Sequence, residues 1–272
     1  MQRVADWGEI TGPVAVYGGV YSNLQAFRAF ARAVADVAHG GVICTGDVVA
    51  YCADAHGAVE AVRTAGHRVI AGNCESQLAA GALDCGCGFE DGTACDLLSA
   101  GWYAHASAQV DAAQRAWMAE LPHWAVFSHA GRRVLVVHGA PSAQNRFVWP
   151  VTPDDDLQRE VGIAEAAIGP VDMIVSGHSG IPFDRDLGRH RWVNAGVIGM
   201  PPHDGETATR YVRLDANGSV RIERLTYDPA PAVAAMEAAG LTQGYHRALT
   251  TGRWPSEDVL PEEMRRQQRA SV

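Results

Sequence analysis

The sequence predicts an α/β fold in which short buried strands alternate with helices. Apolar runs at 14–17, 42–44 and 69–71 each end at a glycine-containing turn, and the segments between them space their apolar residues as helices do. A later stretch, 211–225, turns at Ala-Asn-Gly and is typical of antiparallel strands. With 272 residues, 47% of them hydrophobic, the chain can bury one sizeable core. We therefore expect a single domain over 1–272.

The first part of the chain is expected to place a helix after each strand. Ser22 is a candidate N-cap for a helix over 23–38, because apolar residues recur there at helical spacing. A second helix is expected at 58–65, between the second and third strands.

The middle of the chain changes character. The segment 78–101 is rich in glycine, cysteine and acidic residues and has weak periodicity, so it is expected to form a long Cys-rich loop with short helices. A helix at 111–120 follows, and Leu121-Pro122 ends it. The strands at 125–128 and 134–137 are expected to form a β-hairpin.

The remaining elements are a helix, a buried strand and a terminal extension. The helix is expected at 154–168 and the strand at 171–175. From 229 to 272 the sequence predicts a helical extension, interrupted by prolines and packed on the outside of the domain.

Composition and charge exclude several classes of function. The net charge is −9 and no arginine run supplies a basic patch, so no nucleic-acid partner is expected. The chain has no lysine, which excludes a Schiff base and a lysine phosphate cradle. It shows neither a signal-peptide pattern nor an apolar run of roughly 20 residues, so we expect a cytoplasmic protein that does not enter a membrane. The sequence predicts no particular oligomeric state.

Four polar residues each follow an apolar strand and lie next to a glycine: Asp47, Asn73, His138 and His178. The glycine allows a sharp turn, which directs the side chain out at the carboxyl edge of the strand. One carboxylate, one amide oxygen and two imidazoles suit a divalent Zn, Mn or Fe ion. A single such residue is a weak signal, but four in order predict a metal site.

The segments that carry these residues resemble the motifs of the calcineurin-like metallophosphoesterases. The ordered series is TGDVVAY, AGNCES, VVHGAP, SGHSGIPF and WVNAGVIGMPPHDG, within 14–214, and it looks closest to the bacterial single-domain phosphodiesterase branch. The resemblance implies a β-sandwich of two sheets flanked by helices. It also implies two metal ions that activate a hydroxide, and a small anionic phosphoester as the substrate.

The resemblance assigns metal-binding roles residue by residue. It implies that Asp47 is the carboxylate shared by both ions, that Asn73 is the amide ligand, and that His138 and His178 are imidazole ligands of one ion. Ligands of the other ion are missing. Gly19 and Tyr21 stand where the family has Asp and His, and Gly180 stands where it has a second His. One divalent ion per chain is therefore expected, in a dinuclear site that has lost half of its ligands.

Cys74 and Tyr21 are the candidate catalytic residues. Cys74 stands where many members of the family carry a catalytic His, although some members of this branch also carry Cys. Tyr21 has two interpretations. Its hydroxyl could hydrogen-bond a bound phosphate or water, or its ring could fill the space of the lost ion. We favour the second.

All six cysteines fall between residues 44 and 95. In a reducing compartment, metal binding or reactivity is expected more often than a disulfide. One hypothesis is that two or more of Cys74, Cys85, Cys87 and Cys95, with Cys52 as a further candidate, supply thiolates to a second, softer ion, zinc or iron, or to an iron–sulfur centre. The alternatives are a structural zinc knot at the C-x-C pair, or no metal role.

The sequence thus favours a metal-dependent phosphoester hydrolase with one retained ion. The alternatives are a metal- or ligand-binding protein that no longer hydrolyses, and a thiolate- or iron-dependent enzyme in the same cavity.

Overall fold

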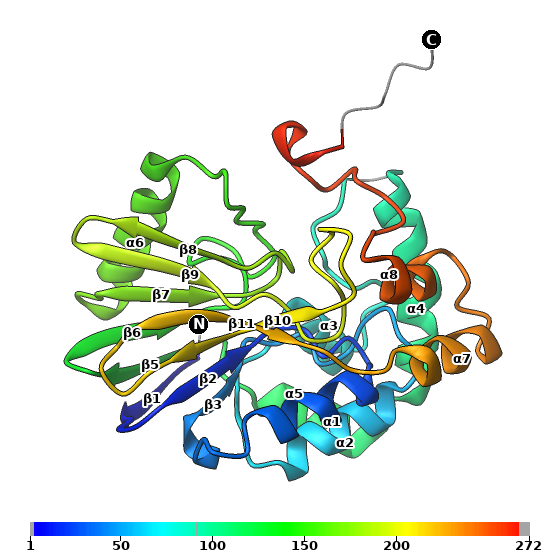
Figure 1. Cartoon of the computed structure of the whole chain (residues 1–272), viewed down its shortest axis with the longest axis horizontal. Helices are drawn as coiled ribbons and strands as arrows, with labels where there is room; N and C mark the ends of the chain where they lie inside the picture. Colours follow the sequence, from blue (N-terminus) through cyan, green and yellow to red (C-terminus); the bar gives the residue numbers. More distant parts are fainter. Residues whose placement is uncertain (1–2, 91, 267–272) are drawn as a thin grey trace.

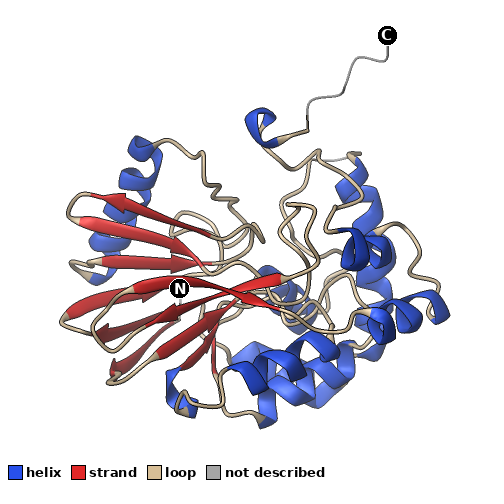
Figure 2. Cartoon of the chain, in the orientation of Figure 1, coloured by secondary structure: helices blue, strands red, loops and turns tan. Residues whose placement is uncertain are grey.

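The computed structural model describes residues 3–90 and 92–266, which form two β-sheets packed face to face with helices on both outer sides (Figure 1). The predicted α/β sandwich of two sheets flanked by helices is confirmed (Figure 2). Residues 1–2, 91 and 267–272 lie outside the described residues, and with them the last part of the predicted extension.

One sheet has six strands in the order β1-β5-β6-β7-β9-β8. Its strands are β1 (Val4–Glu9), β5 (Trp124–His129), β6 (Arg132–Val136), β7 (Met173–Ser176), β8 (Phe183–Leu187) and β9 (His190–Asn194). β6, β7 and β9 run parallel to one another, whereas β5 pairs antiparallel with β6 and confirms the predicted hairpin.

The other sheet has five strands in the order β11-β10-β2-β3-β4. Its strands are β2 (Val14–Tyr17), β3 (Val42–Cys44), β4 (Arg68–Val69), β10 (Thr209–Leu214) and β11 (Val220–Leu225). β2, β3 and β4 are parallel, and β10 and β11 complete the sheet as an antiparallel pair.

Successive side chains of a strand point to opposite faces of its sheet, and this decides which core each residue joins. In β2, Val14 and Val16 point to the core between the sheets, whereas Ala15 and Tyr17 point to the core under the helices. Because successive strand side chains face opposite sides, a strand buried on both faces must be apolar throughout, as β2 is. Each fully buried valine contributes about 1.5–3 kcal/mol relative to an exposed one.

Helices form the two outer layers. They are α1 (Leu24–Ala33), α2 (Ala55–Thr64), α3 (Asn73–Ala80), α4 (Ala94–Gln109), α5 (Ala112–Glu120), α6 (Asp154–Ile168), α7 (Ala230–Ala238) and α8 (Tyr245–Thr251), with 3-10 turns at His39–Gly41 and Glu262–Met264. α6 packs on the outer face of the six-stranded sheet, and α1 and α2 pack on the outer face of the five-stranded sheet (Figure 1). No helix in the described part of the chain is long and apolar enough to span a membrane.

Two predicted elements differ from the structure. α1 begins at Leu24 and is capped by Asn23, whose Oδ1 accepts a hydrogen bond from Ala26 N, because Ser22 has a positive φ and its hydroxyl accepts from Ala50 N instead. The segment 78–101 is not one long loop. α4 already begins at Ala94, where the Thr93 hydroxyl caps it, and the polar and small residues on its buried face hide the helical period.

Candidate metal centre

The four predicted metal ligands lie where strands of both sheets end. Asp47 follows β3 and Asn73 begins α3 directly after β4, both in the five-stranded sheet. His138 follows β6 and His178 follows β7, in the six-stranded sheet. Because parallel strands end at a common edge, two ligands from each sheet meet where these edges face each other.

His138 Nε2 is the point on which the other three side chains converge. It lies 3.0 Å from Asn73 Oδ1, 3.1 Å from His178 Nδ1 and 3.2 Å from Asp47 Oδ2. The more distant pair is His178 Nδ1 and Asp47 Oδ2, at 4.0 Å. All four residues are buried, with at most 8% of any of them exposed.

Hydrogen bonds behind His138 and Asn73 fix which atom of each faces the centre. His138 Nδ1 donates to the Thr45 carbonyl at 2.6 Å, so in the neutral ring Nε2 carries the lone pair. Asn73 Nδ2 donates to the Cys85 carbonyl at 2.8 Å, which leaves Oδ1 facing inward. The donor groups of His138 and Asn73 are thus occupied elsewhere, and the lone pairs of His138 Nε2 and Asn73 Oδ1 face each other. Such an arrangement requires a shared proton or a cation.

The pKa values follow from burial and mutual charge. For Asp47 burial acts to raise the pKa, but the charge of His138 and its hydrogen bond to the carboxylate outweigh burial and lower the pKa. For His138 burial acts in the lowering direction, yet Asp47 and the Thr45 carbonyl together raise the pKa. His178 is the opposite case: burial, reinforced by the charge of His138, lowers its pKa to about 3, so it stays neutral.

Glu75 holds the loop that carries Asp47. Its Oε2 accepts from Asp47 N at 2.7 Å and Gly72 N at 2.9 Å, while Oε1 accepts from Val48 N at 2.8 Å and Val49 N at 3.4 Å. Asp47 itself has a positive φ of 58°, a costly conformation for an aspartate that this anchoring maintains.

The donor set fits a divalent cation. Metal–ligand bonds of about 2.0–2.2 Å place neighbouring ligand atoms roughly 3.0–3.5 Å apart, the spacing found around His138 Nε2. Asp47, His138 and His178 form a buried group able to hold a metal ion, and Asn73 Oδ1 adds an amide oxygen beside it. One carboxylate, one amide and two imidazoles suit Zn, Mn or Fe.

Aromatic rings cover the positions at which the resemblance predicts that ligands are missing, and the first of these positions is Gly19. A Cβ atom on Gly19 would lie 2.5 Å from Cε1 and Cζ of Tyr21 and 2.8 Å from Val197 Cγ1. The ring of Tyr21 therefore takes the space into which an aspartate at position 19 would extend. This contact supports the interpretation of Tyr21 as a space-filling residue.

Trp254, from the C-terminal extension, covers Gly180. A Cβ on Gly180 would contact the Trp254 ring at 3.5 Å, so the atoms of a histidine beyond Cβ would have to displace the indole. Trp254 is held in place because its Nε1 donates to the Pro201 carbonyl and its backbone N donates to His203 Nδ1, both at 2.8 Å.

The cysteines lie around the four-residue centre. Cys74 is buried beside it, and its pKa is raised well above the usual value by burial and by the charge of Asp47, so it remains a thiol. The structure joins Cys85 and Cys87 in a disulfide, which differs from the expected free thiols. A disulfide has no thiolate for a metal, so their predicted metal role applies to a reduced form and stays a prediction. Cys95 lines a pocket that His178 also lines, close to Ser256 and Val259.

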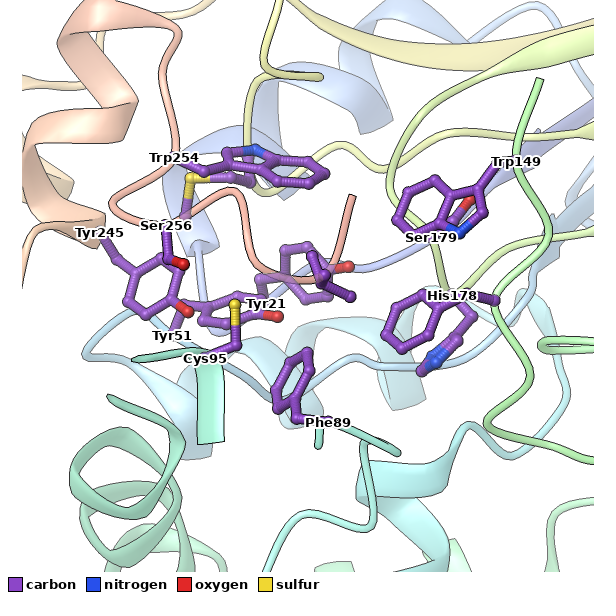
Figure 3. A pocket seen from close by; sticks show the side chains of 13 residues that line it. Tyr21, Tyr51, Phe89, Cys95, Trp149, His178, Ser179, Tyr245, Trp254 and Ser256 are labelled. Carbon is purple, nitrogen blue, oxygen red and sulfur yellow. The ribbon is translucent and has the colours of Figure 1, made fainter. Parts of the chain in front are cut away.

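An aromatic pocket opens beside His178 (Figure 3). In this view Trp254, Tyr21 and Tyr51 lie on one side, Trp149 and His178 on the other, and Phe89 below. Sequence reasoning missed this pocket, because its walls come from segments far apart in the chain that carry no shared motif.

Comparison with known proteins adds a family and a fold. The chain matches the profile of the calcineurin-like phosphoesterase superfamily domain over residues 14–219. No curated protein sequence matches it.

Several solved structures resemble this chain, and the similarity covers nearly the whole length of each solved chain. A metallophosphoesterase from Sphaerobacter thermophilus shares 18% identity at a TM-score of 0.69, covering 89% of this chain and 100% of its own. A hypothetical protein from Pyrococcus horikoshii OT3 shares 17% identity at a TM-score of 0.72, covering 88% and 98% respectively. A putative diadenosine tetraphosphatase shares 15% identity at a TM-score of 0.52, covering 83% and 99%. At these identities the likeness concerns the fold.

Proposed function

Because this chain belongs to the calcineurin-like phosphoesterase superfamily, we propose that it is a phosphoester hydrolase that works with one divalent metal ion per chain. The proposed ligands are Asp47, Asn73, His138 and His178. The observation that carries the proposal is the convergence of Asn73 Oδ1, His178 Nδ1 and Asp47 Oδ2 on His138 Nε2, with the donor groups of His138 and Asn73 bonded elsewhere.

When bound, the ion would polarise a phosphoryl oxygen and lower the pKa of a water molecule. The protein's own contribution is to fix the ligands. The Thr45 carbonyl holds the tautomer of His138, and the Cys85 carbonyl orients the amide of Asn73. Glu75 holds the backbone of Asp47 in its strained conformation. The ligand atoms therefore need little rearrangement when a substrate binds.

Departure of the product alcohol would proceed without a side-chain acid. Burial raises the pKa values of Cys74, Tyr21 and Tyr51 well above the ordinary values, so they are poor proton donors. His178 has a pKa of about 3 and is neutral near pH 7. Esters whose alcohols leave without protonation are therefore the better substrates.

The rings beside the proposed centre favour a second candidate function, a ligand-binding protein that does not hydrolyse phosphoesters. Tyr21 and Trp254 cover the positions of the missing ligands, so a second activating charge has no visible place. Such a protein would bind the metal and a phosphoester without turnover.

Hydrolysis of bis(4-nitrophenyl) phosphate with added Mn²⁺ tests the proposal. We expect slow turnover that chelation abolishes and that Asp47→Ala removes. Asp155→Ala is the matched control, because Asp155 is an exposed residue of the first turn of α6, and it should retain the wild-type rate. Metal binding without turnover in the wild type would reject the hydrolase and leave the binding protein.

A further inference from the structure

The aromatic pocket stands where the family resemblance places the ligands of a second metal ion. Tyr21 covers Gly19 and Trp254 covers Gly180, and both rings line the pocket. His178 belongs both to the pocket wall and to the four-residue centre. A ligand in the pocket would therefore lie directly beside a metal ion bound at that centre.

The walls of the pocket are flat rings. On one side the rings of His178, Phe147 and Trp149 follow one another, with centroids 4.2 Å and 5.3 Å apart, and Phe147 and Trp149 are parallel within 4°. On the other side Tyr21 and Tyr51 pack edge to face, with centroids 4.7 Å apart (Figure 3). The space between them is about 40 Å³, and it grows to about 460 Å³ only when the open mouth is counted.

We infer that this pocket binds the aromatic ring of an aryl phosphoester, with the phosphate directed to the metal centre. This inference rests on the proposed function and names its substrate class.

The charge of the surroundings selects such a ring over other occupants. The residues that line the pocket include no Asp, Glu, Arg or Lys among those the structure describes, so a second phosphate would find no counter-charge. Rings can also bind a quaternary ammonium group. Here the neighbouring centre would combine one carboxylate with a divalent cation, which leaves a net positive charge that repels an ammonium group. A neutral planar ring suffers neither penalty.

The chemistry of the leaving group also favours an aryl phosphoester as the substrate. An aryl ester departs as a phenolate, which needs no proton from the protein, whereas an alkyl ester departs as a strongly basic alkoxide. The described residues that line the pocket include no Asp, Glu or Lys that could protonate such an alkoxide. In the hydrolysis, water supplies the oxygen that forms the new P–O bond, the bond between phosphorus and the aryl oxygen breaks, and the water's proton goes to solvent.

The test compares binding of phenylphosphonate and cyclohexylphosphonate to the Mn²⁺-loaded protein by calorimetry. Neither phosphonate can be hydrolysed, and they differ in the planarity and aromaticity of one ring. Wild type should bind phenylphosphonate about tenfold more tightly, the size of a favourable aromatic contact. Trp149→Ala should remove most of this preference. Trp7→Ala is the matched control, because Trp7 packs against the core between the sheets, and it should keep the preference.

Each outcome bears on the inference separately from the proposed function. Equal binding of the two phosphonates, or a preference that survives in Trp149→Ala, overturns the inference even if the protein hydrolyses phosphoesters. A preference for the phenyl ring without any hydrolysis keeps the ring site and rejects the hydrolase. Tighter binding of phosphocholine than of phenylphosphonate also overturns the inference, in favour of an ammonium site.

A second comparison, of adenosine monophosphate with ribose 5-phosphate, shows whether the pocket prefers a nucleobase to a simple aryl ring. If the base increases the affinity more than tenfold, the aryl assignment is wrong.

Discussion

His138 is the residue on which the proposed centre depends. Its Nε2 faces Asp47, Asn73 and His178, and its Nδ1 is bonded to the Thr45 carbonyl. Burial acts to lower its pKa, but the Asp47 carboxylate and the Thr45 carbonyl raise it overall. Without metal, therefore, the lone-pair cluster is satisfied by a proton on His138. A metal ion has to displace that proton.

Metal affinity should therefore depend on pH through one proton. Below the raised pKa of His138 the ring is protonated, so the dissociation constant for Mn²⁺ should fall about tenfold per pH unit as the pH rises, and level off above that pKa. His178, with a pKa of about 3, is already neutral and should add nothing to the slope. Calorimetric titration between pH 5.5 and 8.5 measures this, and a slope of two or of zero contradicts it.

Replacing Gly19 tests the packing of Tyr21. Gly19→Asp should destabilise the fold by about 1–3 kcal/mol, because the new Cβ overlaps the Tyr21 ring. Adding Tyr21→Ala to that variant should recover part of the loss by removing the ring. The coupling is measured by urea denaturation of the two single variants and the double variant. Strictly additive effects would show that the ring does not occupy this space.

The convergence of the four proposed ligand residues could be predicted from the sequence because each has a local signature. Asp47 and His178 follow apolar strands and lie next to glycines, and the end of a parallel strand is a defined place in the fold. Trp149 and Trp254 carry no such signature, since their neighbours in space are distant in sequence. The disulfide between Cys85 and Cys87 depends on redox conditions, which the sequence does not encode.

Among the secondary-structure elements, the N-terminal turn of α3 and the loop after β3 act together. Glu75, in the first turn of α3, accepts hydrogen bonds from backbone N–H groups of Asp47, Val48, Val49 and Gly72. Two N–H groups face each carboxylate oxygen. One side chain thus satisfies the helix terminus and shapes the loop that presents the carboxylate of the metal centre.

Glu75→Gln should destabilise the protein by about 1–3 kcal/mol. Glutamine offers one acceptor oxygen, so its NH₂ group would face two N–H donors that lose their partner. Burial, together with the charge of Asp47, raises the pKa of Glu75 to about 7, so urea denaturation is best measured at pH 8, where the carboxylate is ionised. Glu120→Gln, at the exposed end of α5, should stay within about 0.5 kcal/mol of wild type. Equal stability of both variants contradicts this role.

The elements that were predicted well have strong periodicity. α6 has the expected bounds, 154–168, because its apolar and acidic residues alternate with the helical turn and acids begin it. α4 was missed because its buried face carries Cys95, Ser99 and Ala106 among its aromatic residues, which weakens the contrast between its faces. Tertiary packing, more than local pattern, stabilises such a helix.

At the scale of the whole molecule, the proposed metal centre connects the two sheets. Asp47 and Asn73 come from the five-stranded sheet, and His138 and His178 come from the six-stranded sheet. A bound ion should therefore resist separation of the sheets and stabilise the entire domain.

Metal should raise the global free energy of unfolding. At a free Mn²⁺ concentration one hundred times the dissociation constant, binding to the folded state alone adds about 2.7 kcal/mol. Thermal denaturation of the wild type with Mn²⁺ or with chelator measures this gain. The variant His178→Ala should show little response to metal. An equal response in both proteins would place the stabilising ion elsewhere.

The most direct test of the single-ion centre is the metal content of the protein purified without added metal, measured by elemental analysis. We predict about one divalent ion per chain in the wild type, its loss in His138→Ala, and its retention when Cys85 and Cys87 are both replaced by serine. Two ions per chain, or full metal content in His138→Ala, would contradict the account.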